Sequence, residues 1–208
     1  MEFEIDRPNS DEHVLLHELN HRINNEFAAA IGVVSAAAAR SRNQKVKAAL
    51  TGVRELLHRY ADVHRALRMP EDDAPLDVAA YLQRLCVSIS RSKLEDRKIK
   101  LVLSVQSLPL QADQCWRLGM ILYELITNAA RHAFDSGGGE IRVALRRDDS
   151  VIRCTVQDNG SAPAHIRPGH GLKIVNELSD GLGGRFTARF GPEGSRSLLI
   201  LPAESVPR

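Results

Sequence analysis

The segment HELNHRINN, residues 17–25, places several groups that can handle protons and phosphate within two helical turns. Residues three and four apart share a helical face, so His21 would lie beside Glu18 on one side and Asn25 on the other. A neutral imidazole is nucleophilic through its unprotonated nitrogen, which makes His21 a candidate phosphoryl acceptor. Glu18 is placed to take or stabilise the proton on the other nitrogen. Asn25 is placed to hydrogen-bond a phosphoryl oxygen or a hydrolytic water.

Two other interpretations of this helix stay open. A polar helical face that carries histidine and asparagine can be solvated surface and nothing more. In addition, His13, His17 and His21 follow one another four residues apart, a spacing that can hold Zn²⁺ on one face of a helix. Residues elsewhere in the chain must decide between phosphate chemistry and these alternatives.

A second set of polar residues ends a long apolar pattern, in the segment ELITNAARHAF, residues 124–134. Glu124, Asn128 and His132 are four residues apart and would share one helical face. The amide oxygen of Asn128 can complete an Mg²⁺ shell that already holds phosphates and waters, because Mg²⁺ needs few protein ligands. Arg131 can meet phosphate charge. A solvent-exposed helix end would show the same pattern.

The segment VQDNG, residues 156–160, reads as a strand that ends in an acid and a glycine. The carboxylate of Asp158 can accept a hydrogen bond from a purine amino group, while Gly160 lets the backbone approach the ring. The alternative is an ordinary turn, since Asn-Gly is a frequent turn pair.

A further glycine-rich segment opens the next helical pattern with Gly169, His170, Gly171 and Leu172. Glycines before a helix N-terminus expose backbone N–H groups that can bind phosphate, and the helix dipole adds to this attraction. A glycine-rich helix start without a ligand is the alternative.

Two long helices must position the first of these segments. Apolar residues recur at three- and four-residue spacing from Glu12 to about Arg40 and again from Val46 to Leu67, with a polar break at residues 41–44. This pattern predicts an antiparallel helical hairpin. A hairpin alone leaves much of its apolar stripe in water, so we expect two copies to pair into a dimeric four-helix bundle. The predicted domain covers residues 1–70.

Residues 69–75, MPEDDAP, predict a linker, and a second domain is expected over residues 76–208. It mixes helices and strands without regular βαβ alternation, which predicts an α/β sandwich with a largely antiparallel or mixed sheet and places the whole chain in the α+β class. The expected helices are 78–89, 112–134 and 172–182. The expected strands are 99–105, 140–145, 151–157, 185–190 and 197–201, with a turn at 146–150 between the second and the third.

The composition limits the possible partners. A formal net charge of +2 over 208 residues gives no bulk attraction for nucleic acid or membrane. The acidic, polar N-terminus is not a signal peptide, and no apolar stretch approaches the roughly 18 residues of a membrane span. We therefore expect a cytoplasmic protein. Its three cysteines, Cys86, Cys115 and Cys154, lie in apolar runs and are expected to be buried free thiols.

The order and spacing of these segments resemble sensor histidine kinases of the His-Arg-X-X-Asn type, relatives of the HWE kinases, from about Glu12 to Leu201. HELNHRINN is similar to their H box, which implies that His21 is phosphorylated. RYADVHRAL, residues 59–67, is similar to the end of their second dimerisation helix. ELITNAARHAF, VQDNG and GHGLKIV resemble the N, G1 and G2 boxes of the GHKL (Bergerat) ATP-binding fold, which gyrase and Hsp90 share.

The resemblance implies ATP and Mg²⁺ as cofactors. Glu124 and Asn128 would serve Mg²⁺ and the phosphates, with Asn128 as the metal ligand, and Asp158 would serve the adenine. Gly169 and Gly171 would form the hinge of a lid. The expected nucleotide-binding residues are Glu124, Asn128, Arg131, His132, Asp158, Gly160, Gly169, Gly171 and Leu172.

The implied function is a homodimeric histidine kinase that phosphorylates His21 and passes the phosphoryl group to an aspartate of a response-regulator receiver domain. Three features depart from the family pattern. Arg22, not an acid, follows the phosphoacceptor; Ala162 replaces the second glycine of the G1 box; and the segment before Gly169 is short and carries two prolines, Pro163 and Pro168. The first departure leaves the catalytic base open.

The other two departures favour an alternative function, a histidine phosphotransfer protein with a degenerate kinase domain that does not bind ATP. A third hypothesis, a serine kinase or ATP-driven binding module with the same nucleotide fold, leaves HELNHRINN unexplained. Fewer than about 15 residues precede the first helix, too few for a domain. We therefore expect the input signal to come from a separate sensor protein, or from the rest of a longer receptor of which this chain is a fragment.

Overall fold

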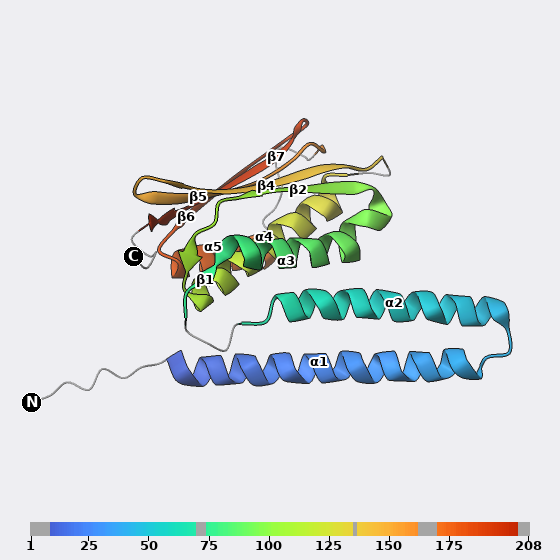
Figure 1. The fold of residues 1–208 in the computed structure, drawn as a ribbon. Helices are drawn as coiled ribbons and strands as arrows, with labels where there is room; N and C mark the ends of the chain where they lie inside the picture. The colour runs from blue at the N-terminus through green and yellow to red at the C-terminus, as the bar shows by residue number, and fades with distance from the viewer. Residues whose placement is uncertain (1–8, 70–73, 135–136, 162–169, 204–208) are drawn as a thin grey trace, which may run out of the picture. The chain divides into compact units, whose positions relative to one another are not determined.

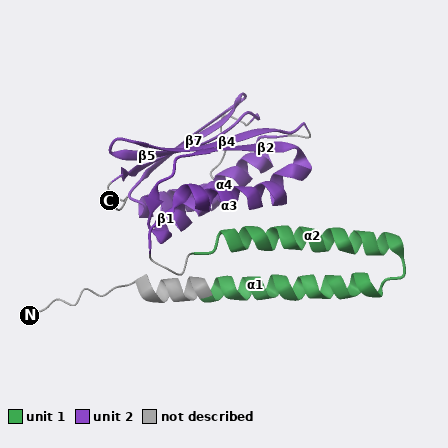
Figure 2. Ribbon diagram, viewed as in Figure 1, with its two compact units in different colours: residues 1–69 green, residues 70–208 purple. Residues whose placement is uncertain are grey.

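The computed structural model describes residues 9–69, 74–134, 137–161 and 170–203, with side chains described from residue 18 onward. The chain divides into two compact units, residues 1–69 and 70–208 (Figure 2).

The N-terminal unit is a hairpin of two long helices, α1 (Asn9–Arg40) and α2 (Gln44–Ala66), as the periodicity predicted (Figure 1). Asn43 begins α2 as its N-cap, and its Oδ1 accepts hydrogen bonds from the backbone N–H groups of Lys45 and Val46. Across the hairpin, the rings of Phe27 and His64 lie with their centroids 5.2 Å apart.

The hairpin buries little of its apolar surface by itself. Among its described side chains, the buried apolar residues are Ala38, Ala61, Val63 and Leu67. Several large apolar side chains stay exposed, and Val33 reaches 68% exposure. The others are Leu19, Val46 and Val53. A single hairpin therefore leaves an uncovered apolar surface, which costs free energy in water.

The C-terminal unit is an α/β sandwich around a five-stranded mixed sheet in the order β2-β4-β5-β7-β6. Only the β2–β4 pair is parallel; the other neighbours are antiparallel. Its strands are β2 (Ile99–Val105), β4 (Gly139–Asp148), β5 (Val151–Asp158), β6 (Arg185–Gly191) and β7 (Gly194–Pro202). This arrangement confirms the expected fold class.

Three helices cover one face of the sheet: α3 (Val78–Ile89), α4 (Ala112–His132) and α5 (His170–Gly181) (Figure 1). Leu122 and Ile126 of α4 are fully buried, which agrees with the apolar pattern of that segment. Helices α3 and α4 approach closely where Tyr81 packs over Gly119, since a Cβ on that glycine would lie 2.7 Å from the tyrosine oxygen.

Some local details differ from the predictions. The strands β4 and β5 extend further toward each other, so the expected turn at 146–150 narrows to Asp149 and Ser150, with Asp149 at φ 50°. Helix α3 continues into a π-helical turn (Ser90–Leu94) and a 3₁₀ turn (Glu95–Arg97). Two short strands, β1 (Leu76–Asp77) and β3 (Pro109–Leu110), form a small separate antiparallel sheet. Two-residue strands carry too little periodicity to be recognised in a sequence.

The three cysteines are buried and unpaired, as expected. Burial raises the pKa of each thiol, those of Cys86, Cys115 and Cys154, to about 12. No helix in the described part of the chain is long and apolar enough to span a membrane.

Candidate functional site

A cavity of about 570 Å³ opens between α4, α5 and the sheet in the C-terminal unit. The described residues among the sequence-predicted nucleotide ligands nearly all line it: Glu124, Asn128, Arg131, His132, Asp158, Gly171 and Leu172. Gly160 is the exception among these described residues. The structure thus brings together segments that lie nearly 50 residues apart in the chain.

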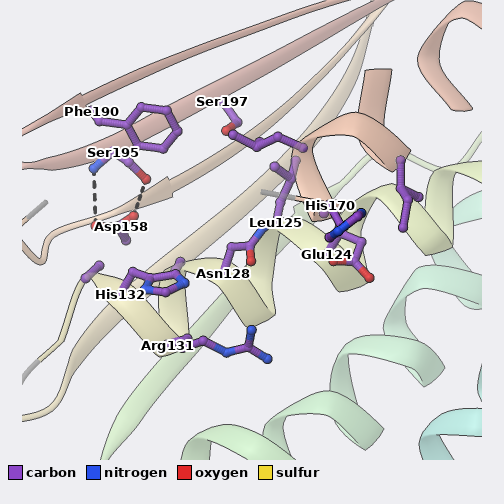
Figure 3. Close-up of a pocket in the computed structure, with 15 residues that line it drawn as sticks. Glu124, Leu125, Asn128, Arg131, His132, Asp158, His170, Phe190, Ser195 and Ser197 are labelled. Carbon is purple, nitrogen blue, oxygen red and sulfur yellow. Dashed lines mark hydrogen bonds between the residues drawn. The ribbon is translucent and has the colours of Figure 1, made fainter. Parts of the chain in front are cut away.

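Helix α4 supplies one wall of the cavity. Glu124, Asn128 and His132 follow one another along its length, so that they span the cavity from one end to the other (Figure 3). Glu124 and Asn128 are half-buried, whereas Arg131 and His132 are exposed. A carboxylate, an amide and a cation on one helix make a donor and acceptor set suited to a phosphate-bound Mg²⁺.

Asp158 lies at one end of the cavity, and its buried carboxylate is hydrogen-bonded to neighbouring residues. It accepts a hydrogen bond from the backbone N–H of Gly160 at 3.0 Å. It also accepts from the backbone N–H of Ser195, at 3.2 Å, and from the hydroxyl of Ser195 (Figure 3). Its side chain and backbone are only 3% exposed. These donors fix the carboxylate in one orientation, and a carboxylate keeps further lone pairs for a ligand.

The turn after Asp158 is attached to the C-terminal end of α4. Ser161 donates its backbone N–H to the carbonyl of Ala133 at 2.8 Å, and Asn159 accepts from the backbone N–H of Glu140 at 2.7 Å. A Cβ on Gly160 would collide with the Ala133 backbone. Gly160 therefore does not line the cavity; its lack of a side chain lets the turn dock on the helix.

The N-terminus of α5 packs against the middle of α4. A Cβ on Gly171 would lie 2.8 Å from Oε2 of Glu124 and 3.0 Å from Nδ2 of Asn128. Only glycine lets the first turn of α5 come this close to both polar groups. His170 lies beside Glu124 at this end of the cavity (Figure 3). The first backbone N–H groups of a helix favour anions, which suits phosphate.

The C-terminal end of α4 is held by Arg97, which the sequence did not single out. Its guanidinium donates to the carbonyl oxygens of Ala130 and Phe134, at 2.9 Å for Phe134. These are carbonyls without helical partners, so the cation both satisfies them and complements the helix dipole. The last turn of α4, with Arg131 and His132, is thereby held in place.

The sequence reasoning missed the lining residues that come from the last two strands: Phe190 at the end of β6, and Ser195 and Ser197 of β7. They come from the last strands, whereas the motifs lie on α4, β5 and α5. A serine directly after the Gly191–Gly194 turn carries no chemical signal of its own. Its pairing with Asp158 depends on strand pairing across 37 residues.

In the N-terminal unit, His21 is exposed on α1 with its Nδ1 3.1 Å from the side-chain amide nitrogen of Asn25. Glu18 lies beside Arg22 instead, whose Nε donates to its Oε1 at 2.8 Å. The amide of Asn25, which was expected to serve phosphate, therefore contacts the imidazole of His21. The carboxylate of Glu18, which was expected to act on the imidazole proton, is paired with Arg22.

Several predicted features lie outside the described residues: Gly169, the residues Ala162, Pro163 and Pro168, and the side chains of His13 and His17 that would complete a zinc site. Among the described residues, no group of three or more histidine, cysteine, aspartate or glutamate side chains is arranged to hold a metal. An Mg²⁺ held chiefly by phosphates and water does not need such a group.

A mixed sheet has three helices on one face, and a cavity lined by Asn128 and Asp158 lies between two of them. This arrangement defines a nucleotide-binding domain of the GHKL type, which follows the helical hairpin in the sequence. The comparisons with known proteins agree. Residues 18–93 match a histidine kinase family model, HisKA_2. Residues 116–205 match the family of histidine kinase-, DNA gyrase B- and HSP90-like ATPases. The chain thus contains the two domain types of a histidine kinase, and the resemblance noted in the sequence is confirmed.

Individual relatives support this assignment. Blue-light-activated histidine kinase 2 of Erythrobacter litoralis is 26% identical over 205 residues, 90% of this chain and 56% of that protein. Sensor histidine kinase PdtaS of Mycobacterium tuberculosis is 26% identical over 147 residues, 70% of this chain and 29% of that protein. The chain thus spans about half or less of the length of these curated relatives.

Solved structures show the same fold. The histidine kinase domain of the Erythrobacter litoralis EL346 blue-light-activated histidine kinase superposes with a TM-score of 0.62 at 21% identity, over 88% of this chain and 97% of that one. Full-length ShkA, solved in complex with AMPPNP, gives a TM-score of 0.55 at 19% identity, over 90% of this chain and 45% of that one.

Proposed function

We propose that this protein is an ATP- and Mg²⁺-dependent histidine kinase that phosphorylates itself on His21 and transfers the phosphoryl group to an aspartate of a response-regulator receiver domain. The observation that carries the proposal is the presence, in one chain, of an exposed histidine on a helical hairpin and a GHKL-type cavity lined by Asn128 and Asp158. The cytoplasmic location expected from the sequence stays a prediction.

The residues around the cavity fit ATP and Mg²⁺. The close approach of Gly171 to Glu124 and Asn128 is a cradle that any larger side chain would fill. Asn128 would hold Mg²⁺ with Glu124 beside it, while Arg131, the backbone of Gly171 and Leu172, and Gly169 would serve the phosphates. When bound, Mg²⁺ neutralises phosphate charge. Asp158 would hold the purine amino group, with His132 beside it.

At the hairpin, His21 takes the γ-phosphoryl group through a ring nitrogen. An N–P bond forms and the bond between the γ-phosphorus and the bridging oxygen breaks, with ADP as the leaving group. The attacking nitrogen must be unprotonated, so the proton must stay on the other one. The contact between Asn25 and the His21 ring supports a role for Asn25 in setting which nitrogen this is. Glu18 would act on that proton only after its pairing with Arg22 is broken.

The uncovered apolar residues of the hairpin, with Val33 the most exposed, support homodimerisation into a four-helix bundle. In this proposal residues 1–70 serve dimerisation and phosphotransfer and residues 76–208 bind ATP. The receiver domain would then meet the exposed face of α1 around His21. The separate sensor protein that would supply the input signal stays a prediction from the sequence.

The proposal is tested with purified protein, Mg²⁺ and γ-labelled ATP, alongside His21→Ala. Acid-labile, base-stable label on the parent protein and none on the variant supports the kinase. Label that persists in the variant contradicts His21 as the acceptor.

A second function is favoured by Ala162 and the short proline-containing segment before Gly169, which depart from the kinase pattern. In that case the protein is a phosphotransfer carrier, and His21 receives its phosphoryl group from another protein and not from ATP. No label on either protein, no binding of AMPPNP, and transfer to His21 from a phosphorylated receiver domain would support the carrier.

A further inference from the structure

The sheet of the C-terminal unit has two faces with different neighbours. Helices α3, α4 and α5 pack on one face, and within the described part of this unit no element covers the other (Figure 1). The alternation along β4 shows the difference: Ile141 and Val143 are buried, whereas Arg142 and Arg146 between and beyond them are exposed. The uncovered face is therefore a broad solvent-facing surface that the proposed kinase chemistry does not use.

This uncovered face is strongly basic. Six exposed arginines project from four neighbouring strands, and we call them together the arginine face. Its members are Arg142 and Arg146 of β4, Arg153 of β5, Arg185 and Arg189 of β6, and Arg196 of β7. The acids at strand positions of this face are Glu140 and Asp148, near the two ends of β4. A chain with a net charge of +2 thus concentrates positive charge on one surface.

The strand register places arginines directly opposite one another. Arg146 is the register partner of Arg153, and Arg189 is the partner of Arg196. Like charges at directly opposed positions destabilise a strand pair. Asp148 relieves the first pair, because its carboxylate lies 3.0 Å from Nε of Arg153. Among the described residues, no carboxylate forms an ion pair with Arg189 or Arg196. The second pair is therefore a place where an external anion would stabilise the fold.

A hollow of about 400 Å³ lies at this second pair. Gln157, Arg189 and Arg196 line it together with the turn that joins β6 and β7. Its other lining residues are Asp158, Phe190 and Ser195, which also line the nucleotide cavity. Two guanidinium groups and an amide are donors that suit a carboxylate, which arginine can bind through two parallel hydrogen bonds. Glu193 of the turn also lines the hollow, yet it forms no ion pair with either arginine in the structure.

A row of small and apolar residues separates two rows of arginines. Ala144, Thr155, Leu198 and Thr187 are successive register partners across four strands. On one side of this row the register aligns Arg142, Gln157, Arg196 and Arg189, and on the other side Arg146, Arg153, Ile200 and Arg185. An apolar centre between arginine-rich margins is typical of protein interfaces. The strand positions of this face carry no aromatic side chain on which a nucleic-acid base could stack.

We propose that the arginine face binds an acidic protein surface, with a carboxylate of the partner seated between Arg189 and Arg196 and a small apolar patch over Leu198. The observations behind this contact do not involve His21, so a failure of the proposed phosphotransfer would not contradict it.

The test uses a synthetic peptide of glutamates with two central leucines, whose binding is measured by fluorescence anisotropy at about 0.15 M salt. Arg196→Glu places a carboxylate opposite Arg189 and so stabilises the strand pair while it removes the anion site. We expect this variant to bind the peptide at least about tenfold more weakly, with an unchanged or higher unfolding temperature. Arg84→Glu, the same charge change at an exposed site on α3, should bind like the parent protein.

Nuclear magnetic resonance shifts on peptide addition should fall on β4, β5, β6 and β7. The proposal is overturned if the parent protein does not bind the peptide, or if Arg196→Glu and Arg84→Glu lose affinity equally. Tighter binding of a DNA duplex of about 20 base pairs through the same arginines would reassign the face to nucleic acid. Tighter binding of phosphatidylserine vesicles would reassign it to an anionic membrane surface.

Discussion

The side-chain amide of Asn25 lies one helical turn beyond His21, with its Nδ2 3.1 Å from the Nδ1 of the imidazole. When the amide donates, Nδ1 must be the unprotonated nitrogen and Nε2 then carries the proton. If the side-chain amide of Asn25 were flipped, its oxygen would lie beside Nδ1 instead. The oxygen would accept a hydrogen bond from the Nδ1–H group and leave the lone pair of Nε2 free to attack phosphorus. Asn25 can therefore select the reactive nitrogen.

Replacement of Asn25 separates these roles. Asn25→Asp supplies acceptor oxygens only and should keep the rate of His21 phosphorylation or raise it. Asn25→Ala removes the contact and should lower that rate about fivefold, the equivalent of one hydrogen bond of about 1 kcal/mol. The measurement is the initial rate of acid-labile labelling from γ-labelled ATP. Equal rates for the two variants would show that Asn25 does not orient the ring.

Asn25 is also proposed to position a water that hydrolyses the phosphate of the partner receiver domain. Dephosphorylation of a labelled receiver domain by Asn25→Ala, at the rate of the parent protein, would remove this second role.

The carboxylate of Asp158 should decide nucleotide affinity. Asp158→Asn places an amide against the donors of Ser195 and Gly160 and should weaken AMPPNP binding by more than about tenfold, since hydrogen bonds to charged groups contribute about 1.5–3 kcal/mol each. Ser195→Ala removes one of these donors and should weaken AMPPNP binding less than Asp158→Asn does.

Calorimetric titration with AMPPNP measures both effects. Ser88→Ala is the matched control for the serine change, because that hydroxyl donates to the carbonyl of Arg84 within α3 and does not line the cavity. If Ser88→Ala and Ser195→Ala change affinity alike, Ser195 does not position Asp158.

Gly171 should be needed for binding and not for folding. In Gly171→Ala the added methyl group would lie 2.8 Å from the Glu124 carboxylate, so the start of α5 or the two polar side chains of α4 must shift. We expect AMPPNP affinity to fall about tenfold or more while the unfolding temperature changes little, because both groups lie at the cavity edge. Gly137→Ala, at a site with open space, is the control. Normal binding by Gly171→Ala would show that α5 does not need this close approach.

Arg97 should contribute to stability through the end of α4. Arg97→Ala leaves the carbonyls of Ala130 and Phe134 without their cationic donor. We expect the free energy of unfolding to fall by about 1–2 kcal/mol, and AMPPNP binding to weaken because the last turn carries Arg131 and His132. Urea unfolding of the variant, beside Arg84→Ala on the exposed side of α3, measures the first effect. An unchanged midpoint would mean that water replaces the guanidinium at no cost.

The buried thiols predict a loss of stability at high pH. Burial raises the pKa values of Cys86, Cys115 and Cys154 from 9.0 to about 12, so the folded protein keeps these protons over a range in which the unfolded chain releases them. The thiols therefore favour the folded state fully below about pH 9, and this contribution is lost as the pH rises toward 12.

Two measurements check this. The urea midpoint should decline above about pH 9, and a disulfide reagent at pH 8 should label the thiols only after unfolding, because thiolate is the reactive form. Rapid labelling of the folded protein would show that these sites open to solvent.

The sequence by itself determined the helices, most strands and the family, because each rests on local signals. The hairpin follows from three- and four-residue spacing, and the strand Ile99–Val105 from the alternation of its own side chains. The motif residues of α4, β5 and α5 could be named as one site because their order along the chain is typical of a known family. Helix ends and turns were less certain, as the narrowing of the 146–150 turn shows, because flanking strands extend when a partner strand is available.

Only the tertiary structure decided which distant residues meet. The bond between Ser195 and Asp158, the cap that Arg97 places on α4, and the seat of Phe190 in the cavity all join segments more than 30 residues apart. The same is true of the arginine face, whose members are scattered over β4 to β7 and align only through strand register. Such contacts depend on which strands pair and in what register. Strand pairing and register minimise the free energy of the whole packed unit, so they cannot be predicted from a local stretch of sequence.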